Sequence, residues 1–370
     1  MNVITIDTTN PRQVRQFCEL PFKIYRDFPL WVPPIETELK QIMNRSKHPY
    51  YLHSDAEFFM VEDNGELLGR IAVLHNRNFC NHHDQKTAFF YYFECVENAE
   101  AARLLLLAAT DWARTRGLNL IIGPKGFMRS SGFGLLIQGH DRSPALGIPY
   151  NPPYYEKFFD DFGFTKESDT FSGLLNHHLN EKIHLIAEKI AKRGNFSIKT
   201  FKNRAEMKKW IPVVEEINRE AFKDYPWYYP STPEEFKHLA NNILEIADTR
   251  FIKLVMHGDE VAGFILVYPN ISAALRRTKG KLFPFGWIDL LQEKKRTRIA
   301  DINGVGFLPQ YQGLGANAFL YTEVEKVLAD ANMIAAEIVQ VEERNFRSKA
   351  DMDAMEVTWT KTHRLYRLPL

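Results

Sequence analysis

Three things are scarce in this chain of 370 residues: cysteine, an excess of charge of one sign, and long apolar runs. The three cysteines, Cys18, Cys80 and Cys95, are odd in number and form no CxxC pair. This argues against a disulfide framework or a zinc site and indicates a reducing environment. The 47 basic and 46 acidic residues give a net charge of only +1. That balance argues against nucleic acid as the main partner.

The apolar stretches, such as Leu104–Ala109 and Phe264–Tyr268, are far too short to cross a bilayer. The first residues also lack the basic start and apolar core of a signal peptide. We therefore expect a cytoplasmic protein with no membrane partner. What the chain does have, 45% hydrophobic and 25% charged residues, is typical of a soluble globular protein, and its length predicts two domains.

The most informative stretch is Gly304–Asn317, GVGFLPQYQGLGAN. An alternating apolar strand, Ile302–Leu308, ends at a proline, a loop with two glycines follows, and a helix is predicted over Ala316–Ala329. The N–H groups of a helix's first turn have no partner within the helix, so such a junction can bind an anion. Gly313 and Gly315 remove side chains where a phosphate would approach.

The order strand, Pro, Gln-x-x-Gly-x-Gly, helix resembles the acyl-CoA pyrophosphate loop of the GNAT superfamily of N-acyltransferases, whose pattern is [Arg/Gln]-x-x-Gly-x-[Gly/Ala]. The resemblance implies that acetyl-CoA or another acyl-CoA binds here. It implies contacts to the pantetheine from the backbone of Gly306, Phe307 and Leu308 and from Asn345. It also implies a pyrophosphate cradle formed by Gln310, Tyr311, Gln312, Gly313, Leu314, Gly315, Ala316 and Asn317.

An earlier part of the chain repeats the elements that precede this loop. Two predicted hairpins carry equivalent glycines, Gly69 and Gly263, 194 residues apart, which indicates an internal duplication. We expect an α/β (α+β) fold of two tandem GNAT-like domains, each a mixed, largely antiparallel twisted sheet flanked by helices. The predicted divisions are an N-terminal domain, a linker helix and a C-terminal domain with an insertion at 270–298, the boundaries being 1–178, 179–197 and 198–370.

Each predicted domain ends in a closing strand, Thr170–Leu175 in the first and Thr358–Arg367 in the second. The first domain differs at its anion loop, because Val96–Ala101 has no glycine and carries two carboxylates. Like charges repel, so we expect this copy not to bind CoA in the standard way.

The insertion is amphipathic and rich in aromatic residues, including Phe283, Phe285 and Trp287. Two interpretations stay open for it: a cover over the acyl or acceptor site, or a segment that packs at the domain interface. Its basic cluster, Lys294–Arg298, is more typical of a solvated surface than of a phosphate-binding patch.

Acyl transfer needs a base for the amine proton and a group that receives the thiolate. Many GNAT enzymes use a Tyr on the helix after the fifth strand, but no Tyr lies between Phe346 and Val357. Tyr366, Tyr311 or ordered water would then protonate the thiolate, or no group need do so. Our candidates for catalytic residues are Tyr366, Glu342 and Asp301, with Tyr311, Asn303, Glu337 and His363 as further possibilities and no metal.

The function expected from the resemblance is acyl-CoA-dependent N-acyl transfer to a small amine held between the two halves of a monomer or homodimer. The alternative is a non-catalytic CoA-binding sensor or scaffold on the same fold. Transfer from aminoacyl-tRNA is disfavoured by the neutral charge.

Overall fold

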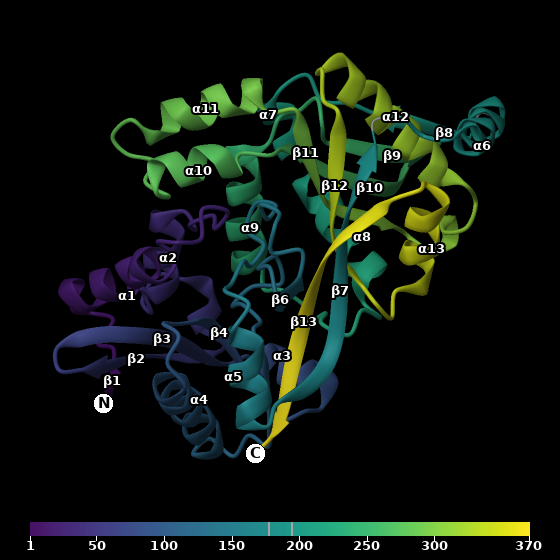
Figure 1. The fold of residues 1–370 in the computed structure, drawn as a ribbon. Coiled ribbons are helices and arrows are strands. Elements are labelled where there is room, and N and C mark those ends of the chain that lie inside the picture. Colours follow the sequence, from purple (N-terminus) through teal and green to yellow (C-terminus); the bar gives the residue numbers. More distant parts are fainter. Residues whose placement is uncertain (177, 194) are drawn as a thin grey trace.

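The computed structural model describes residues 1–176, 178–193 and 195–370. We call residues 1–176 the first half and residues 195–370 the second half. The described residues form one continuous mixed sheet of 13 strands with helices on both faces (Figure 1). Its strand order is β1-β2-β3-β4-β5-β13-β7-β12-β11-β10-β9-β8, and β6 pairs with β13 beside this path.

In the first half, local sequence signals set most elements. Asn10 begins the first helix because its side-chain oxygen accepts from the N–H of Arg12 at 3.0 Å. Asn64 and Gly65, both at positive φ, form the two-residue turn of the first hairpin. The elements are β1 (Asn2–Thr5), α1 (Pro11–Ile24), α2 (Glu36–Met43), β2 (Asp55–Asp63), β3 (Glu66–His75), α3 (Arg77–His83), β4 (Thr87–Cys95), α4 (Ala99–Arg114), β5 (Leu120–Gly123), β6 (Leu135–Gln138), α5 (Tyr155–Phe162) and β7 (Thr165–Asn176).

In the second half, one expected helix is divided. We predict a single helix over Arg204–Phe222, but the chain breaks it before Pro212, which lies in the first turn of the next helix, where a missing N–H costs nothing. The helix α6 (Glu181–Lys192) precedes this half. The elements of the second half are β8 (Phe196–Lys199), α7 (Arg204–Lys208), α8 (Ile211–Phe222), α9 (Pro233–Ile246), β9 (Lys253–His257), β10 (Glu260–Pro269), α10 (Ser272–Thr278), α11 (Gly286–Arg296), β11 (Ile299–Phe307), α12 (Ala316–Asp330), β12 (Ala335–Glu342), α13 (Phe346–Ala354) and β13 (Thr358–Pro369).

The two closing strands are exchanged between the halves. β7, from the first half, pairs with β12, while β13, from the second half, pairs with β5. The two strands also pair with each other and run side by side across the centre of the molecule (Figure 1). The expectation that each half closes its own sheet is therefore wrong.

The exchange places side chains of each half in the core of the other. Tyr366 of β13 is buried with α4 and α5 of the first half, whereas Leu175 of β7 is buried in the core around α12. Neither core is complete without the strand that the other half supplies. The predicted boundaries at 178 and 198 thus mark sequence units, and they stay a prediction as domains.

The predicted linker is largely one helix, α6, and it packs on α12 of the second half. His184 Nε2 lies 3.2 Å from the Glu325 carboxylate, and Ile186 and Ile190 approach Gly315 at the start of α12. Gly194, within the predicted linker, lies outside the described residues.

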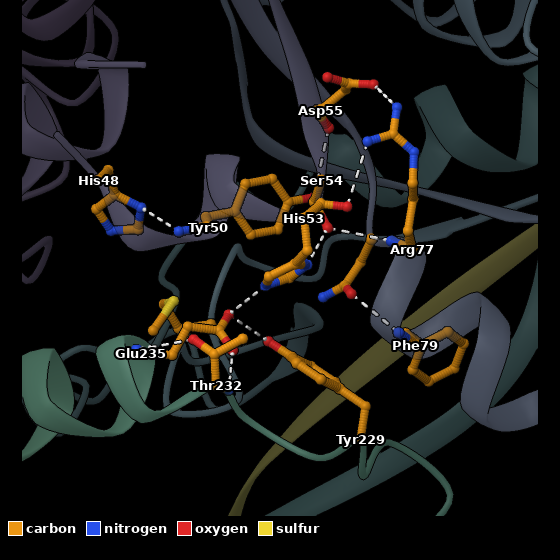
Figure 2. A network of polar contacts seen from close by, with 12 residues as sticks. His48, Tyr50, His53, Ser54, Asp55, Arg77, Phe79, Tyr229, Thr232 and Glu235 are labelled. Atoms are coloured by element: carbon orange, nitrogen blue, oxygen red, sulfur yellow. Dashed lines mark hydrogen bonds and ion pairs between the residues drawn. The ribbon is translucent and has the colours of Figure 1, made fainter. Parts of the chain in front are cut away.

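A polar network between α9 and the first half also joins the two halves (Figure 2). Glu235 is buried, accepts from the N–H of Thr232 at 2.9 Å and lies 3.1 Å from His53 Nε2. Ser54 Oγ is 2.6 Å from the other ring nitrogen of His53, and the Tyr229 hydroxyl is 3.4 Å from Glu235. Glu235 thus caps α9 and contacts the first half with the same carboxylate.

None of the helices, within the residues that the structure describes, has the length and apolarity needed to cross a membrane.

Candidate active site

Strands β11 and β12 pair in parallel and then separate. Their register runs from Ile299 with Ala335 to Ile302 with Ile338. Beyond that point β12 bulges at Gln340, which has a φ of +49°, and follows β7, while β11 stays with β10 through Phe307. One edge of β11 after Ile302 therefore faces a gap. The predicted pantetheine contacts Gly306, Phe307 and Leu308 lie on or directly after this stretch.

The loop between β11 and α12 has the conformation of an open anion site. Gly313 is exposed with a φ of +74°, and a Cβ added there would meet no atom within 4 Å. Gly315 is the N-cap of α12 with a φ of +83°. No side chain caps this helix, and its first turn holds no acidic residue. The N–H groups of that turn are therefore not occupied by a side-chain cap.

Two side chains of the loop hold its shape. The Tyr311 hydroxyl donates to the Glu260 carboxylate, and its ring lies 4.9 Å from that of His257. Gln312 Nε2 donates to the carbonyl of Phe307 at 3.0 Å, and its oxygen accepts from Arg347 at 3.0 Å. These two predicted binding residues thus have structural partners, which leaves the loop backbone as the part able to meet a ligand.

The two predicted asparagines lie at the starts of helices. Asn317, in the first turn of α12, donates to the Asp351 carboxylate at 2.5 Å. Burial raises the pKa of Asp351, and this hydrogen bond opposes the rise. Asn345 begins α13, because its side-chain oxygen accepts from the N–H of Ser348 at 3.1 Å. Its predicted bond to pantetheine stays a prediction. The remaining loop residues, Gln310, Leu314 and Ala316, lie where the sequence puts them, on the loop and at the start of α12.

A buried polar cluster lies on the paired part of β11 and β12, just before the two strands separate. Asp301 is paired in register with Glu337, and Glu337 accepts from Lys361 Nζ of β13 at 2.5 Å. Asp301 accepts from Asn270 at 2.9 Å and from the N–H of Leu146, in the first half, at 3.1 Å. The cluster is therefore built by both halves.

Burial raises the pKa of the Asp301 carboxyl to about 7; the bond from Asn270 opposes the rise and the nearby Glu337 carboxylate adds to it. Burial also raises the pKa of Glu337, against the effect of Lys361. A carboxyl group with a pKa near 7 can both take up and release a proton at neutral pH. The catalytic role predicted for Asp301 stays a prediction.

Glu342 lies at the far end of β12. Its carboxylate accepts from the side chain of Arg344 at 2.7 Å and from the N–H of the same residue at 2.7 Å. Tyr225, from the segment after α8, lies close enough that Glu342 adds to the rise that burial causes in the pKa of the phenol.

Tyr366 is not brought to this site. Its hydroxyl is 3.4 Å from Glu156 of α5, and its ring stacks on Phe159 at 5.3 Å in the core of the first half. Burial raises the pKa of this tyrosine. The strand exchange is the reason, since it carries this end of β13 to β5. Tyr366 is therefore placed as a core residue and not beside the Gly313 loop.

His363 is also buried, and burial lowers its pKa to about 4. One ring nitrogen lies 3.0 Å from the carbonyl of Pro149. Asn303, in contrast, is exposed on β11 at the start of the gap.

An apolar cavity of about 90 Å³ lies between strand β10 and helices α7, α8 and α9. Phe264 and Leu266 line it and pair across the strands with Gly306 and Gly304 of β11. Side chains opposite each other in an antiparallel pair share a face of the sheet. The two glycines therefore leave the β11 side of this face without side chains.

The corresponding junction in the first half differs at every point. Asn98 caps α4 by accepting from the N–H of Ala101 at 2.9 Å, and Glu100 lies in the first turn. The N–H of Cys95 donates to the Tyr155 hydroxyl at 2.7 Å, and the carbonyl of Cys95 accepts from Tyr154 at 3.0 Å. The backbone N–H and carbonyl at the end of β4 are thus already hydrogen-bonded to side chains of the protein.

The sequence does not reveal some residues that the structure brings to the gap. Phe133 donates its N–H to Gln340 of β12 at 3.3 Å, so a first-half loop reaches the bulge. Arg347 reaches the Gly313 loop from α13, and Tyr225 reaches Glu342. Only the aromatic run after α8 could have signalled the last of these. No group of His, Cys, Asp or Glu side chains suited to a metal ion occurs among the described residues.

No family model matches the chain. Two curated proteins are similar to it in sequence. A bacterial ceramide synthase from Caulobacter vibrioides is 26% identical over 299 residues, which span 80% of this chain and 77% of that protein. Protein YghO from Escherichia coli is 22% identical over 355 residues, which span 95% of this chain and 86% of that protein.

Among solved structures, the chain is similar to a tandem GNAT protein from the clavulanic acid biosynthesis pathway. The match covers 100% of this chain and 98% of that one, with a TM-score of 0.57 and 12% sequence identity. The parted parallel strands and the strand–loop–helix junction occur once in each half. The chain therefore has the GNAT fold and matches a tandem GNAT structure over its full length.

Proposed function

We propose that the chain is an acyl-CoA-dependent N-acyltransferase whose second half binds the acyl-CoA. One observation carries the proposal: the uncapped start of α12, with Gly313 open to solvent, adjoins the free edge of β11. Pyrophosphate suits the first and pantetheine amides suit the second. The similarity to a ceramide synthase, a protein named for forming an amide, supports the same class of reaction.

The acceptor amine would bind between the halves. Two loops of the first half meet the second half there, one through Phe133 and Gln340 and one through Leu146 and Asp301. In the reaction the amine nitrogen attacks the thioester carbonyl carbon, the C–S bond breaks and CoA leaves as a thiolate. We assign the proton lost by the amine to Asp301, whose pKa of about 7 fits that task.

The apolar cavity favours an acyl chain longer than acetyl. Fourteen of the fifteen side chains that line it are apolar or aromatic, and Asn218 is the remaining one. Ala240 lies on its wall, so Ala240→Phe should fill it. We expect this variant to lose activity with longer acyl-CoAs by roughly tenfold while activity with acetyl-CoA stays within a few-fold. A chain-length preference unchanged by Ala240→Phe would remove this part of the proposal.

Release of free CoA thiol from a series of acyl-CoAs, measured with a panel of small and long-chain amines, tests the proposed activity. Turnover with any amine, lost in Gly313→Glu, supports it. The second candidate is a CoA-binding sensor, and the placing of Tyr366 in the first-half core, with no tyrosine on α13, favours that candidate. Saturable CoA binding without thiol release for any amine would decide for the sensor.

A further inference from the structure

The insertion before β11 forms an apolar surface that faces outward. Phe283 and Phe285 are 76% and 74% exposed. Trp287, Ile288 and Leu291 of α11 are exposed beside them. These five residues, which we call the α11 surface, lie within nine positions, whereas most other exposed large apolar side chains are scattered along the chain. Figure 1 shows α10 and α11 at the upper left, outside the sheet.

This surface is not needed to pack the insertion onto the molecule. The inner side chains Leu275 and Leu290 are buried in a separate small core with Ile271 and Ala274, and Val32 and Leu146 of the first half pack against it. Ser272 Oγ donates to the carbonyl of Pro144 at 3.1 Å. The interpretation of the insertion as an interface segment is thus confirmed for α10. A helix that buries one apolar face and exposes a second apolar face to water is expected to bind another surface through the second face.

Basic residues flank the α11 surface in the sequence. Residues 276–298 contain eight Lys and Arg and two acidic residues, a net charge of +6, so the other residues of the +1 chain sum to −5. Both acidic residues are already bound, because Arg277 pairs with Asp289 at 2.8 Å and with Glu293 at 2.5 Å. Besides Arg277, the exposed cations of this segment are Lys279, Lys281, Lys295, Arg296 and Arg298. The excess of positive charge therefore lies in the same segment as the exposed aromatic residues Phe283, Phe285 and Trp287.

We propose that the α11 surface docks on an anionic lipid bilayer. Aromatic and aliphatic side chains on one face with Lys and Arg at the rim are the features of a helix that lies in the plane of a membrane interface. A second copy of the chain fits less well, since a symmetric contact would bring +6 against +6. A protein partner fits less well too, because interface cores are depleted in lysine. This differs from the expectation of no membrane partner, which considered only spanning segments.

Cosedimentation of the full chain with vesicles of phosphatidylcholine and phosphatidylglycerol, and with phosphatidylcholine alone, tests the proposal. We expect binding to the anionic vesicles that weakens with added salt. Phe283→Ser/Phe285→Ser/Trp287→Ser and, separately, Lys281→Glu/Lys295→Glu should each weaken it at least tenfold. Leu52→Ser, at another exposed apolar residue, and Lys182→Glu/Lys189→Glu, with the same change of charge, are matched controls that should bind like the wild type.

All the substituted side chains, those of the controls included, are exposed, so thermal melts should show that each variant folds like the wild type. Absence of binding to anionic vesicles, or equal binding by the triple serine variant, would overturn the proposal. So would light scattering that shows a wild-type dimer dissociated by that variant. CoA binding measured without vesicles should be the same in the triple variant and the wild type, which separates this inference from the proposed function.

Discussion

Helix α4 in the first half and helix α12 in the second half both begin where a central strand ends, but their first turns differ. Asn98 caps α4, and Glu100 lies in its first turn. The hydroxyls of Tyr154 and Tyr155 form hydrogen bonds with the carbonyl and the N–H of Cys95. Gly315 leaves α12 without a side-chain cap, and no acidic residue follows. The same junction can thus satisfy its own N–H groups or leave them for a ligand. We infer that only the second half binds CoA.

The parallel strand pairs below the two junctions also differ. On the face of the sheet opposite the junction helix, the second half places Asp301 beside Glu337, while the first half places Phe89 beside Ile122. The first-half pair is part of an apolar core. In our proposal the second half therefore carries both the chemistry and the CoA site, while the first half supplies loops and a closing strand.

The largest effect should follow removal of β13. A chain ending at residue 357 loses the strand between β5 and β7 and leaves the first-half core around Phe159 open. Because that core is needed for folding, we expect loss of the cooperative melt and of soluble protein, an effect on the order of the whole 5–15 kcal/mol of a domain's stability. Removal of residues 1–6, which takes away the edge strand β1, is the control and should leave a melt. A melt that survives loss of β13 would show that each half closes itself.

The next effect is on CoA affinity. Gly313→Glu places a carboxylate at the predicted pyrophosphate position and should weaken CoA binding by roughly 100-fold, or about 2.7 kcal/mol. Gly313→Asn is the control, since Asn tolerates the φ of +74° and adds no charge, and should bind within a few-fold of the wild type. Glu100→Gln, in the first half, should change nothing. If calorimetry gave equal CoA affinities for the Glu and Asn variants, the pyrophosphate would not bind beside Gly313.

Asp301 should make the free energy of unfolding depend on pH in the direction opposite to that of most acidic residues. Its pKa of about 7 lies above the ordinary value of 3.8, so the folded state binds the proton more tightly than the unfolded state. The stability it contributes is then present below about pH 4 and falls as the pH rises toward 7, by a few kcal/mol. Asp301→Asn should flatten the change of Tm over this range.

If Asp301 is also the base, Asp301→Asn should lower kcat by roughly 100-fold or more while CoA affinity stays the same. In the wild type, kcat should then rise as the pH passes through about 7. A flattened Tm profile with unchanged kcat would leave Asp301 a purely structural residue that holds Leu146 and Asn270.

The smallest effect concerns the cap of α4. Asn98→Ala removes the hydrogen bond to the N–H of Ala101 and should lower the free energy of unfolding by about 1 kcal/mol. The increase in Tm on adding CoA should be the same as for the wild type, because we expect no CoA binding at α4. A smaller increase would mean that the first half takes part in binding.

Local patterns in the sequence predict most of the elements. The strands predicted over Thr170–Leu175 and Thr358–Arg367 lie within β7 and β13, and α12 begins at Ala316 as expected from the glycines before it. These elements depend on alternation, caps and turns that lie within a few residues of one another. The GNAT fold itself could be predicted from the junction and its repetition.

The sequence could not reveal the strand exchange or its consequences. β7 and β13 carry the same alternation whichever sheet they join, so nothing local tells which half they close. For the same reason Tyr366 has the right type for an acid but lies in the first-half core. The bonds from Asn270 and Leu146 to Asp301 depend on tertiary packing, and the short strand β6 was not predicted at all.

The stoichiometry of CoA binding tests the central claim most directly. Titration calorimetry of the wild-type chain with CoA should give one site per chain, since α12 lacks the side-chain cap that α4 has at the other of the two described junctions. Two sites would show that the first half also binds the ligand despite its capped helix and two carboxylates, and no saturable site would contradict the assignment of the Gly313 loop itself.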